Sequence, residues 1–322
     1  MGSDRILIFL NKAWWLNDHS KKSFAVCIQM RRSGSHGRGN GREALRPQPE
    51  RTSTMKRLMQ ILMTTAFTAT AAIALAADDG DGMKAIALSG DKTLHKIDAK
   101  TAEVKASMEV EGVGKLLGID LRPATGQLIG VTDAFEIVEI DPESGLATVI
   151  SKMDKELPVE DGAAVIVDFN PKANKLRFMS GVTNHRVDIE SGAVTVDGSL
   201  AFEEKDMHAG EAPDIVAAAY TNSFGTPDAT AMYDIDRTIV ALIRQTSPND
   251  GTLAAIGKLG VDGTEVYAFD VATDSEGNNT AWLVSGNMLH TLSLESGEVA
   301  ESWEIKGADG ATVRDITFMT AM

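Results

Sequence analysis

A unit of four short strand-like segments recurs along this chain and constrains its fold more than any other feature. The clearest copy covers residues 116–150. An apolar run that ends at Pro123 is followed there by three further runs, and a tight turn, D-P-E-S-G, precedes the last of them. Repeats of about 40–50 residues with four short strands each are typical of propeller blades. We therefore predict an all-β propeller.

The turn before the fourth strand is the strongest marker of the repeat. It reads D-P-E-S-G at Asp141–Gly145, D-I-E-S-G at Asp188–Gly192 and L-S-L-E-S-G at Leu292–Gly297, with a weaker version at Lys96–Thr101. One copy has an N-D-G turn instead, within Ser247–Leu253. Asp and Ser side chains bond the local backbone and Gly accepts a positive φ, so these residues favour tight turns.

The first strand of each copy is a nearly continuous apolar run, which indicates burial on both faces between neighbouring blades. Four such runs align, at Leu116–Pro123, Ala163–Pro171, Asp214–Asn222 and Glu265–Thr273. Residues 83–110 supply three more strands without a first strand, and residues 312–319 supply a first strand alone. We predict five four-stranded blades. The fifth is shared by both ends of the chain and is closed by pairing of the N- and C-terminal strands, which leaves no unpaired strand edge there.

The beginning of the chain differs from the remainder. Residues 1–54 are basic and rich in Ser, Gly and Arg, and residues 55–76 combine a charged start, an apolar middle and a small-residue end. This order is typical of a secretory signal peptide. We expect a disordered, mis-assigned upstream extension over 1–54, a signal peptide over 55–76 with cleavage near Ala76, and one propeller domain over 77–322. The alternative is a genuine N-terminal arm with Met55–Ala77 as a membrane anchor.

The composition of the expected mature chain narrows its partners. The first 76 residues hold 12 of the 31 Lys and Arg and 4 of the 46 Asp and Glu, which leaves a net charge of −23, and they hold the single Cys. Such a negative charge argues against nucleic acid and anionic membranes as partners. We expect a monomer without an integral membrane segment, in a bacterial periplasm or outside the cell.

Carboxylates recur in the expected innermost strands. They are Asp120, Asp168, Asp270 and Asp315, while the third copy has Ala219 at this place. Four acids at equivalent points would lie near the propeller axis, and a buried carboxylate must be hydrogen-bonded, paired or metal-bound. One interpretation is that each Asp accepts hydrogen bonds from the neighbouring blade. The other is a Ca²⁺ or substrate site; apart from this Ca²⁺, no cofactor is expected.

A second group of polar residues gathers mainly in the second and third blades, where guanidinium groups stand out in so acidic a chain. The candidates for ligand binding are Arg122, Asn170, Arg177, Asn184, Arg186 and Asn222. Guanidinium groups hold carboxylates or phosphates at two points. The alternative is that Arg177 and Arg186 pair with the inner Asp residues in a network between blades.

No known catalytic motif appears. The histidines of the expected mature chain, His95, His185, His208 and His290, lack the spacing of zinc ligands. There is no G-x-S-x-G elbow, P-loop or dinucleotide fingerprint. Trp282 and Trp303 are expected to be packing residues. These patterns favour a protein that is not an enzyme, without deciding the question.

Four motifs in order resemble a bacterial family catalogued as domain of unknown function 4394. They are G-x-D-x-R-P-A-T-G-x-L at Gly118–Leu128, D-F-N-P at Asp168–Pro171, A-A-A-Y-T-N at Ala217–Asn222 and P-N-D-G-T-L at Pro248–Leu253. The resemblance covers nearly all of the expected mature chain. One departure is His185, where the family has Leu within N-L-R. The resemblance implies an exported repeat-strand domain and no particular activity.

Two main functions remain open. The first is a non-enzymatic binding or interaction module for an unknown ligand or protein, motivated by the regular repeat. The second is a calcium-assisted hydrolase that acts on a sugar or lactone at the propeller axis. A mechanical or envelope-related role is a third possibility that the sequence does not address.

Overall fold

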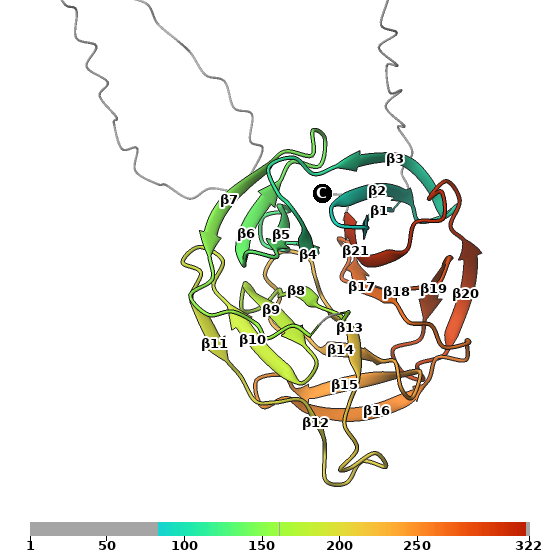
Figure 1. Ribbon diagram of the computed structural model, residues 1–322. Coiled ribbons are helices and arrows are strands. Elements are labelled where there is room, and N and C mark those ends of the chain that lie inside the picture. Colours follow the sequence, from blue (N-terminus) through green and yellow to red (C-terminus); the bar gives the residue numbers. More distant parts are fainter. Residues whose placement is uncertain (1–82, 161, 320–322) are drawn as a thin grey trace, which may run out of the picture. The chain divides into compact units, whose positions relative to one another are not determined.

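The computed structural model describes residues 83–160 and 162–319, and all their regular structure is β-strand. Figure 1 shows five small sheets arranged as the blades of a propeller around a common centre. The prediction of an all-β, five-bladed propeller is therefore confirmed. The expected upstream extension (1–54) and signal peptide (55–76) lie outside the described residues.

Each blade is an antiparallel sheet whose strands follow one another from the innermost to the outermost. In this order, blade 1 contains β21 (Val313–Met319), β1 (Lys84–Ser89), β2 (Thr93–Asp98) and β3 (Glu103–Glu109). Blade 2 contains β4 (Leu116–Leu121), β5 (Leu128–Thr132), β6 (Glu136–Ile140) and β7 (Ala147–Lys152). Blade 3 contains β8 (Ile166–Asn170), β9 (Lys175–Ser180), β10 (Thr183–Val187) and β11 (Val194–Val196).

The other two blades follow the same plan, with one addition. Blade 4 contains β13 (Ile215–Tyr220), β14 (Met232–Asp236), β15 (Ala241–Ser247) and β16 (Thr252–Lys258). A short strand, β12 (Ala201–Phe202), pairs in parallel with β16 at the outer edge. Blade 5 contains β17 (Tyr267–Thr273), β18 (Asn279–Ser285), β19 (Met288–Leu292) and β20 (Val299–Glu304).

The two ends of the described chain share blade 1. Strand β21 pairs with β1 in an antiparallel register that places Phe318 opposite Ala85, with an irregularity between Leu88 and Ser89. Strand β1 continues the sheet to β2, where Leu88 is opposite Leu94. The predicted closure is confirmed, and the ring is continuous because β21 also lies beside β4 and β17.

Apolar side chains from adjacent blades form the core, which is why the inner strands are buried along nearly their whole length. The contact between blades 5 and 1 illustrates this packing. The Trp282 ring stacks on Phe318 with centroids 5.0 Å apart, and its centroid lies 6.0 Å from that of Trp303. Both tryptophans are therefore packing residues, as the sequence predicts.

The repeated turn places a glycine against the preceding blade. Gly192 has a φ of +73°, and a Cβ built on it would lie 1.9 Å from the carbonyl oxygen of Lys152 at the end of β7. The turn thus needs glycine both for its backbone conformation and for the close approach of two chains. Blade 1 has Ala102 in its weaker turn, with a φ of +53°.

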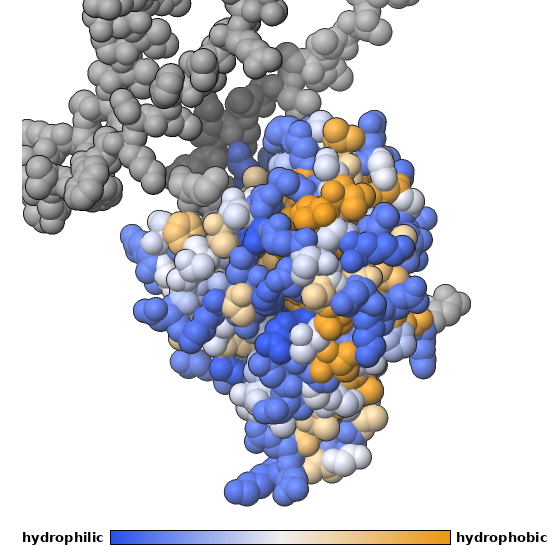
Figure 2. All heavy atoms as spheres, turned by 90° about the vertical axis from the view of Figure 1, so that its left-hand side faces the viewer, coloured by the Kyte–Doolittle hydropathy of each residue, from blue (hydrophilic) through white to orange (hydrophobic). Residues whose placement is uncertain are grey.

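The side of the ring that carries β7 and β11 is mainly polar. Figure 2 shows the side of the ring on which β7 and β11 lie, where hydrophilic residues predominate and apolar residues form separate groups. Leu146 and Val149 of blade 2 and Val196 of β11 are among the exposed apolar side chains. Within residues 83–160 and 162–319, no helix has the length and apolar character needed to cross a bilayer.

Candidate functional site

Three carboxylates converge where the inner strands meet. Asp120 of β4, Asp168 of β8 and Asp270 of β17 are all buried, and each offers an oxygen that lies within 4.8 Å of the others. Oxygen atoms of carboxylates are the ligands that Ca²⁺ prefers, although Ca²⁺ takes six to eight of them. These three residues are the part of the described chain best suited to hold such an ion.

The carboxylates also join the blades. Each accepts a hydrogen bond from the backbone of the next inner strand around the ring: Phe169 N donates to Asp120 Oδ2 at 2.7 Å, Tyr220 N to Asp168 Oδ1 at 3.0 Å, and Phe318 N to Asp270 Oδ2 at 2.9 Å. The expectation that inner Asp residues accept hydrogen bonds from the neighbouring blade is therefore confirmed. Their structural role does not exclude a ligand, since a carboxylate has about four lone-pair sites.

The alignment that makes Asp315 equivalent to these three residues is wrong by two positions. Thr317 occupies the equivalent place in β21, because its hydroxyl accepts a hydrogen bond of 3.2 Å from the backbone N of Leu121, one residue beyond Asp120. Asp315 instead accepts a hydrogen bond of 2.7 Å from the backbone N of Ile119. Ile119 lies two residues before Leu121, nearer the start of β4. The strand pairing agrees, because β21 has an irregularity just before Asp315 and β4 has the same irregularity just before Gly118, two residues ahead of Asp120.

Burial determines the electrostatics of the axis. Desolvation raises the pKa of Asp270 to about 6 and that of Asp315 to about 7. It also raises the pKa values of Asp120 and Asp168 well above their ordinary range, with a further increase from the neighbouring carboxylates. A cation near these groups would favour their ionised forms, so the axis is complementary to positive charge.

Pockets lie at opposite ends of the inner strands. A pocket of about 270 Å³ lies where these strands end, and its lining includes Asp120, Asp270, Phe224, Phe318 and Met319. We call it the axial pocket. It combines two buried carboxylates with apolar side chains, which is the composition of many small-molecule sites.

The pocket at the other end is larger, about 430 Å³, and is lined where the inner strands begin. Its lining includes two arginines, Arg237 and Arg314, and Arg314 is engaged in the fold. The guanidinium donates to the backbone carbonyl oxygens of Leu116 at 2.6 Å and Leu117 at 2.9 Å, and Nε donates to Gly90 O at 2.8 Å. Arg314 thus joins blade 1 to blade 2, and most of its donors are used within the protein.

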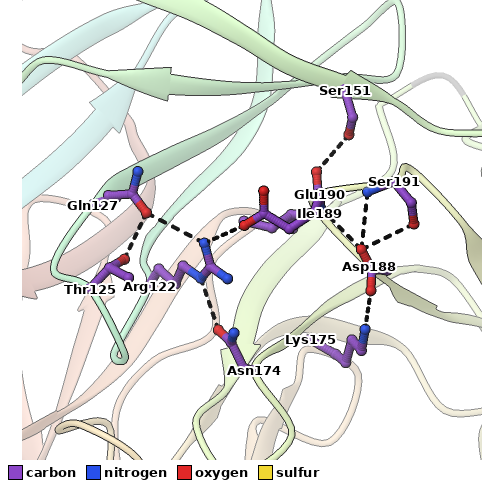
Figure 3. Close-up of polar contacts among 10 residues, drawn as sticks. All are labelled: Arg122, Thr125, Gln127, Ser151, Asn174, Lys175, Asp188, Ile189, Glu190 and Ser191. Carbon is purple, nitrogen blue, oxygen red and sulfur yellow. Dashed lines mark hydrogen bonds and ion pairs between the residues drawn. The ribbon is translucent and has the colours of Figure 1, made fainter. Parts of the chain in front are cut away.

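Arg122 joins blades 2 and 3. Figure 3 shows its guanidinium between Gln127, Asn174 and Glu190. Nε donates to Asn174 Oδ1 at 2.8 Å, and Nη1 forms an ion pair of 2.8 Å with Glu190. This predicted ligand residue lines the axial pocket, but the side chain is anchored in contacts within the protein.

Arg177, Asn184 and Arg186 meet in one buried network. Arg177 Nη1 donates to Asn184 Oδ1 at 2.8 Å and pairs with Asp197 at 2.7 Å, and Arg186 reaches the same carboxylate at 3.1 Å. Arg177 Nη2 also donates to the hydroxyl of Tyr220 in blade 4 at 3.1 Å. The expected network between blades exists, but its acid is Asp197 rather than an inner Asp.

The remaining two candidates lie apart. Asn222 has a φ of +60° and exchanges amide hydrogen bonds with Asn279, which links blades 4 and 5. Asn170 accepts a hydrogen bond from the backbone N of Ala173 and lines a small pocket between blades 3 and 4. The structure therefore brings three of the six candidates together and places the others at separate contacts between blades.

Two histidines make similar buried contacts in blades 1 and 5. Each ring nitrogen lies within hydrogen-bond distance of a serine: Ser89 at 2.7 Å and Ser107 at 2.8 Å for His95, and Ser285 at 3.0 Å and Ser302 at 2.7 Å for His290. Burial lowers the pKa of both imidazoles, which favours their neutral form. Repetition across three adjacent strands in two blades indicates a structural role.

Some of the important residues were not identified from the sequence. Thr317 is the fourth side-chain acceptor at this level of the inner strands, and Asp234 is a fully buried acid whose oxygens both lack a hydrogen-bond partner among the described residues. The alternation in M-Y-D-I-D could have revealed Asp234, since its position is in phase with the apolar Met232. No local signal marks Thr317, because its partners are remote in sequence.

The solved structures that match this chain have low sequence identity to it and low TM-scores. One, a protein of unknown function from Bacteroides thetaiotaomicron, is 15% identical, with 74% of this chain and 64% of that chain covered and a TM-score of 0.46. Another, a calcium-binding regucalcin from Agrobacterium tumefaciens, is 14% identical, with 67% and 68% covered and a TM-score of 0.39. Similarity this low does not indicate a function for this chain.

Comparison with protein families gives a clearer result. No curated protein sequence matches this chain. The sequence model of one family matches residues 93–317, and the family is described as Domain of unknown function (DUF4394). The match spans all five blades and includes the four motifs that carry the resemblance. The chain therefore belongs to the DUF4394 family.

Proposed function

We propose that this chain is an exported propeller of the periplasm or cell exterior that binds a small molecule in the axial pocket without transforming it. The composition of this pocket carries the proposal. Asp120 and Asp270 lie in its wall beside Phe224, Phe318 and Met319. A ligand with a positively charged amine and a short apolar part would complement both kinds of side chain.

The similarity among the axial acids favours binding over catalysis. Burial raises the pKa of all four acids, and the pKa of none is lowered. The three equivalent residues also make the same hydrogen bond to the next blade, which is the pattern of a structural repeat.

Thermal melting with small amines tests this proposal. We expect putrescine or ethanolamine hydrochloride to raise the melting temperature relative to an equal concentration of sodium chloride, and Asp270→Asn to remove the increase. Asp168→Asn is the matched control, because Asp168 does not line the axial pocket. Failure of both amines to stabilise the protein, or an equal response in Asp270→Asn, would contradict binding at this pocket.

The second candidate is a calcium-assisted hydrolase that acts on a sugar or lactone. The convergence of oxygens from Asp120, Asp168 and Asp270 favours it. This candidate expects stabilisation by Ca²⁺ that EDTA and Asp168→Asn abolish, together with Ca²⁺-dependent turnover of a glycoside or lactone. Melting that is indifferent to Ca²⁺, with no turnover on such a panel, would reject it.

Export is tested separately. We expect N-terminal sequencing of the protein recovered outside the cytoplasm to begin near Ala77. A sequence that begins at or before Thr54 would contradict export by this signal peptide.

A further inference from the structure

The loop that joins β13 to β14, residues 221–231, reaches across the end of the inner strands at which the axial pocket lies. The backbone N of Gly225, in this loop of blade 4, donates a hydrogen bond of 3.1 Å to the carbonyl oxygen of Pro123 in blade 2. Blades 2 and 4 are separated in the ring by blade 3, whose inner strand β8 contacts both β4 and β13 (Figure 1). The loop therefore passes blade 3 to reach blade 2, and we call it the crossing loop.

The crossing loop forms one wall of the axial pocket. The lining includes residues 223–225 of this loop and residues 122–126 of the blade 2 loop that it contacts. The other described lining residues belong to β4, β17 and β21, and none belongs to blade 3. Asp168 of β8 is thus outside the pocket, although its carboxylate converges with the two that line it. The two loops in contact close the pocket on the side of blade 3.

The base of the crossing loop is fixed to blade 5. Asn222 N donates to Asn279 Oδ1 at 2.7 Å, and Asn279 Nδ2 donates to Asn222 Oδ1 at 2.8 Å. Ser223 N donates to Thr273 Oγ1 at 2.8 Å. The first and last residues of the loop also pair through a backbone hydrogen bond of 2.8 Å. These contacts make the base the stationary part of the loop.

The tip of the loop is held much less firmly. Among the described residues, the bond from Gly225 N to Pro123 O is the single hydrogen bond that joins residues 224–230 to a part of the chain outside the loop. A Cβ added to Gly225 would have no atom within 4 Å, and Phe224 is 37% exposed. One neutral hydrogen bond adds little net stability, because water replaces it when it breaks. The tip can therefore leave blade 2 while the base stays in place.

We propose that the crossing loop is the lid of the axial pocket. It releases Pro123 to admit a ligand, and it closes with Phe224 against the apolar part of the bound molecule. This inference rests on the proposed function, which is the binding of a small amine in the same pocket. Lids of this kind move about a few residues at their ends, and Asn222, with a φ of +60°, lies at such a point.

Hydrogen–deuterium exchange of the purified protein, resolved to single amides, tests the motion. In the free protein we expect the amide of Gly225 to be at least about tenfold less protected than that of Ser223, because the tip opens without the base. Putrescine at about 10 mM, against sodium chloride at equal ionic strength, should slow the exchange of Gly225 and leave Ser223 unchanged. In Asp270→Asn, which lacks one carboxylate of the pocket, putrescine should have no effect on either amide.

Phe224→Ala tests the contact between lid and ligand, because it removes the ring and keeps the backbone hydrogen bonds of the loop. By isothermal titration we expect the Kd of butylamine to rise about fivefold and that of methylamine to change by less than about twofold, since methylamine has little apolar surface to lose. Val182→Ala is the matched control. Val182 is an apolar side chain with an exposure of 42% that does not line the pocket, so both Kd values should stay the same.

Three results would each overturn the lid: equal protection of Gly225 and Ser223 in the free protein, exchange of Gly225 that putrescine does not slow, or an equal loss of both amines in Phe224→Ala. The melting temperature then shows how far the failure extends. If putrescine still raises it, the lid alone is rejected and amine binding stands. If putrescine does not raise it, amine binding in the axial pocket is rejected as well.

Discussion

The hydroxyl of Thr317 donates a hydrogen bond of 2.8 Å to the carboxylate of Asp120, which lies 197 residues earlier in the chain. This contact joins the last strand of the propeller to the inner strand of blade 2. The same hydroxyl accepts from the backbone N of Leu121. One short side chain thus fastens the two blades that meet where the ring closes.

Thr317→Val tests this closure. The substitution keeps the shape of the side chain and removes the hydrogen bonds, so we expect unfolding to become easier by about 1–3 kcal/mol. Urea denaturation followed by tryptophan fluorescence measures the change. Thr317→Ser, which retains the hydroxyl, should lose much less. Equal stability of Thr317→Val and the wild type would contradict a fastening role.

The pH dependence of stability follows from the buried acids. Burial raises the pKa of Asp315 to about 7 and that of Asp234 to about 8. The folded state therefore binds more protons than the unfolded state up to these values, and stability must fall as the pH rises. In the presence of EDTA we expect the free energy of unfolding to decrease between about pH 7.5 and about pH 8.5.

The buried histidines do not obscure this pH range. Burial lowers the pKa of His95, His185 and His290 from the ordinary value of about 6.5, so all three are largely neutral above about pH 7.5 whether the chain is folded or unfolded. Their contribution appears at lower pH, where their protonation favours the unfolded state. Asp234→Asn should flatten the decrease across the higher range, and a stability that rises there would contradict the prediction.

Replacement of the glycine in the repeated turn should lower the free energy of unfolding. Gly192→Ala would place a Cβ 1.9 Å from Lys152 O on a backbone with a φ of +73°. We expect a loss of about 2–4 kcal/mol from strain and displacement of the adjoining chain. Gly210 is the matched control, because its φ is +84° but no atom lies within 4 Å of a Cβ added there. Gly210→Ala should cost only about 1–2 kcal/mol.

Phe318 reports on the contact between blades 5 and 1. It is 4% exposed and stacks on Trp282. Phe318→Ala should cost about 3–5 kcal/mol and change the fluorescence of Trp282. Met207→Ala, at a side chain that is 85% exposed, should have little effect. Similar melting temperatures for the two variants would show that β21 does not stabilise the ring.

Arg177 distinguishes a structural network from a ligand site. Arg177→Met would leave Asp197 paired only with Arg186, which is less buried. We expect the free energy of unfolding to fall by about 3–5 kcal/mol, because removal of the guanidinium leaves the buried Asp197 carboxylate without its closest partner. Denaturation measures the loss. A stable variant with altered ligand binding would instead assign Arg177 to recognition.

The fold could be predicted because its signals are local and repeated. The turn around Gly192 occurs in several copies, and runs such as that of β17 are apolar on both faces. The axial register could not be predicted, because β21 carries an acid two residues before the position that matches the other carboxylates, and only the contacts with β4 distinguish the two positions. Asp315 therefore resembled its neighbours in sequence, while Thr317 takes the equivalent position in space.

The partners of the arginines were also beyond local sequence patterns. Arg177 bonds Asn249, which lies 72 residues later, and Arg122 pairs with Glu190, which lies 68 residues later. Each contact depends on how two separate sheets are placed. The sequence could indicate that such cations need anions, but not which acid lies within reach.

The shared blade has a consequence for the order in which the protein is made. Strands β1, β2 and β3 are synthesised first, yet β1 lacks its inner partner until the ribosome has added residues 313–319. During most of translation the inner edge of β1 therefore has no strand to pair with. The finished ring can therefore form only after nearly the whole chain has emerged.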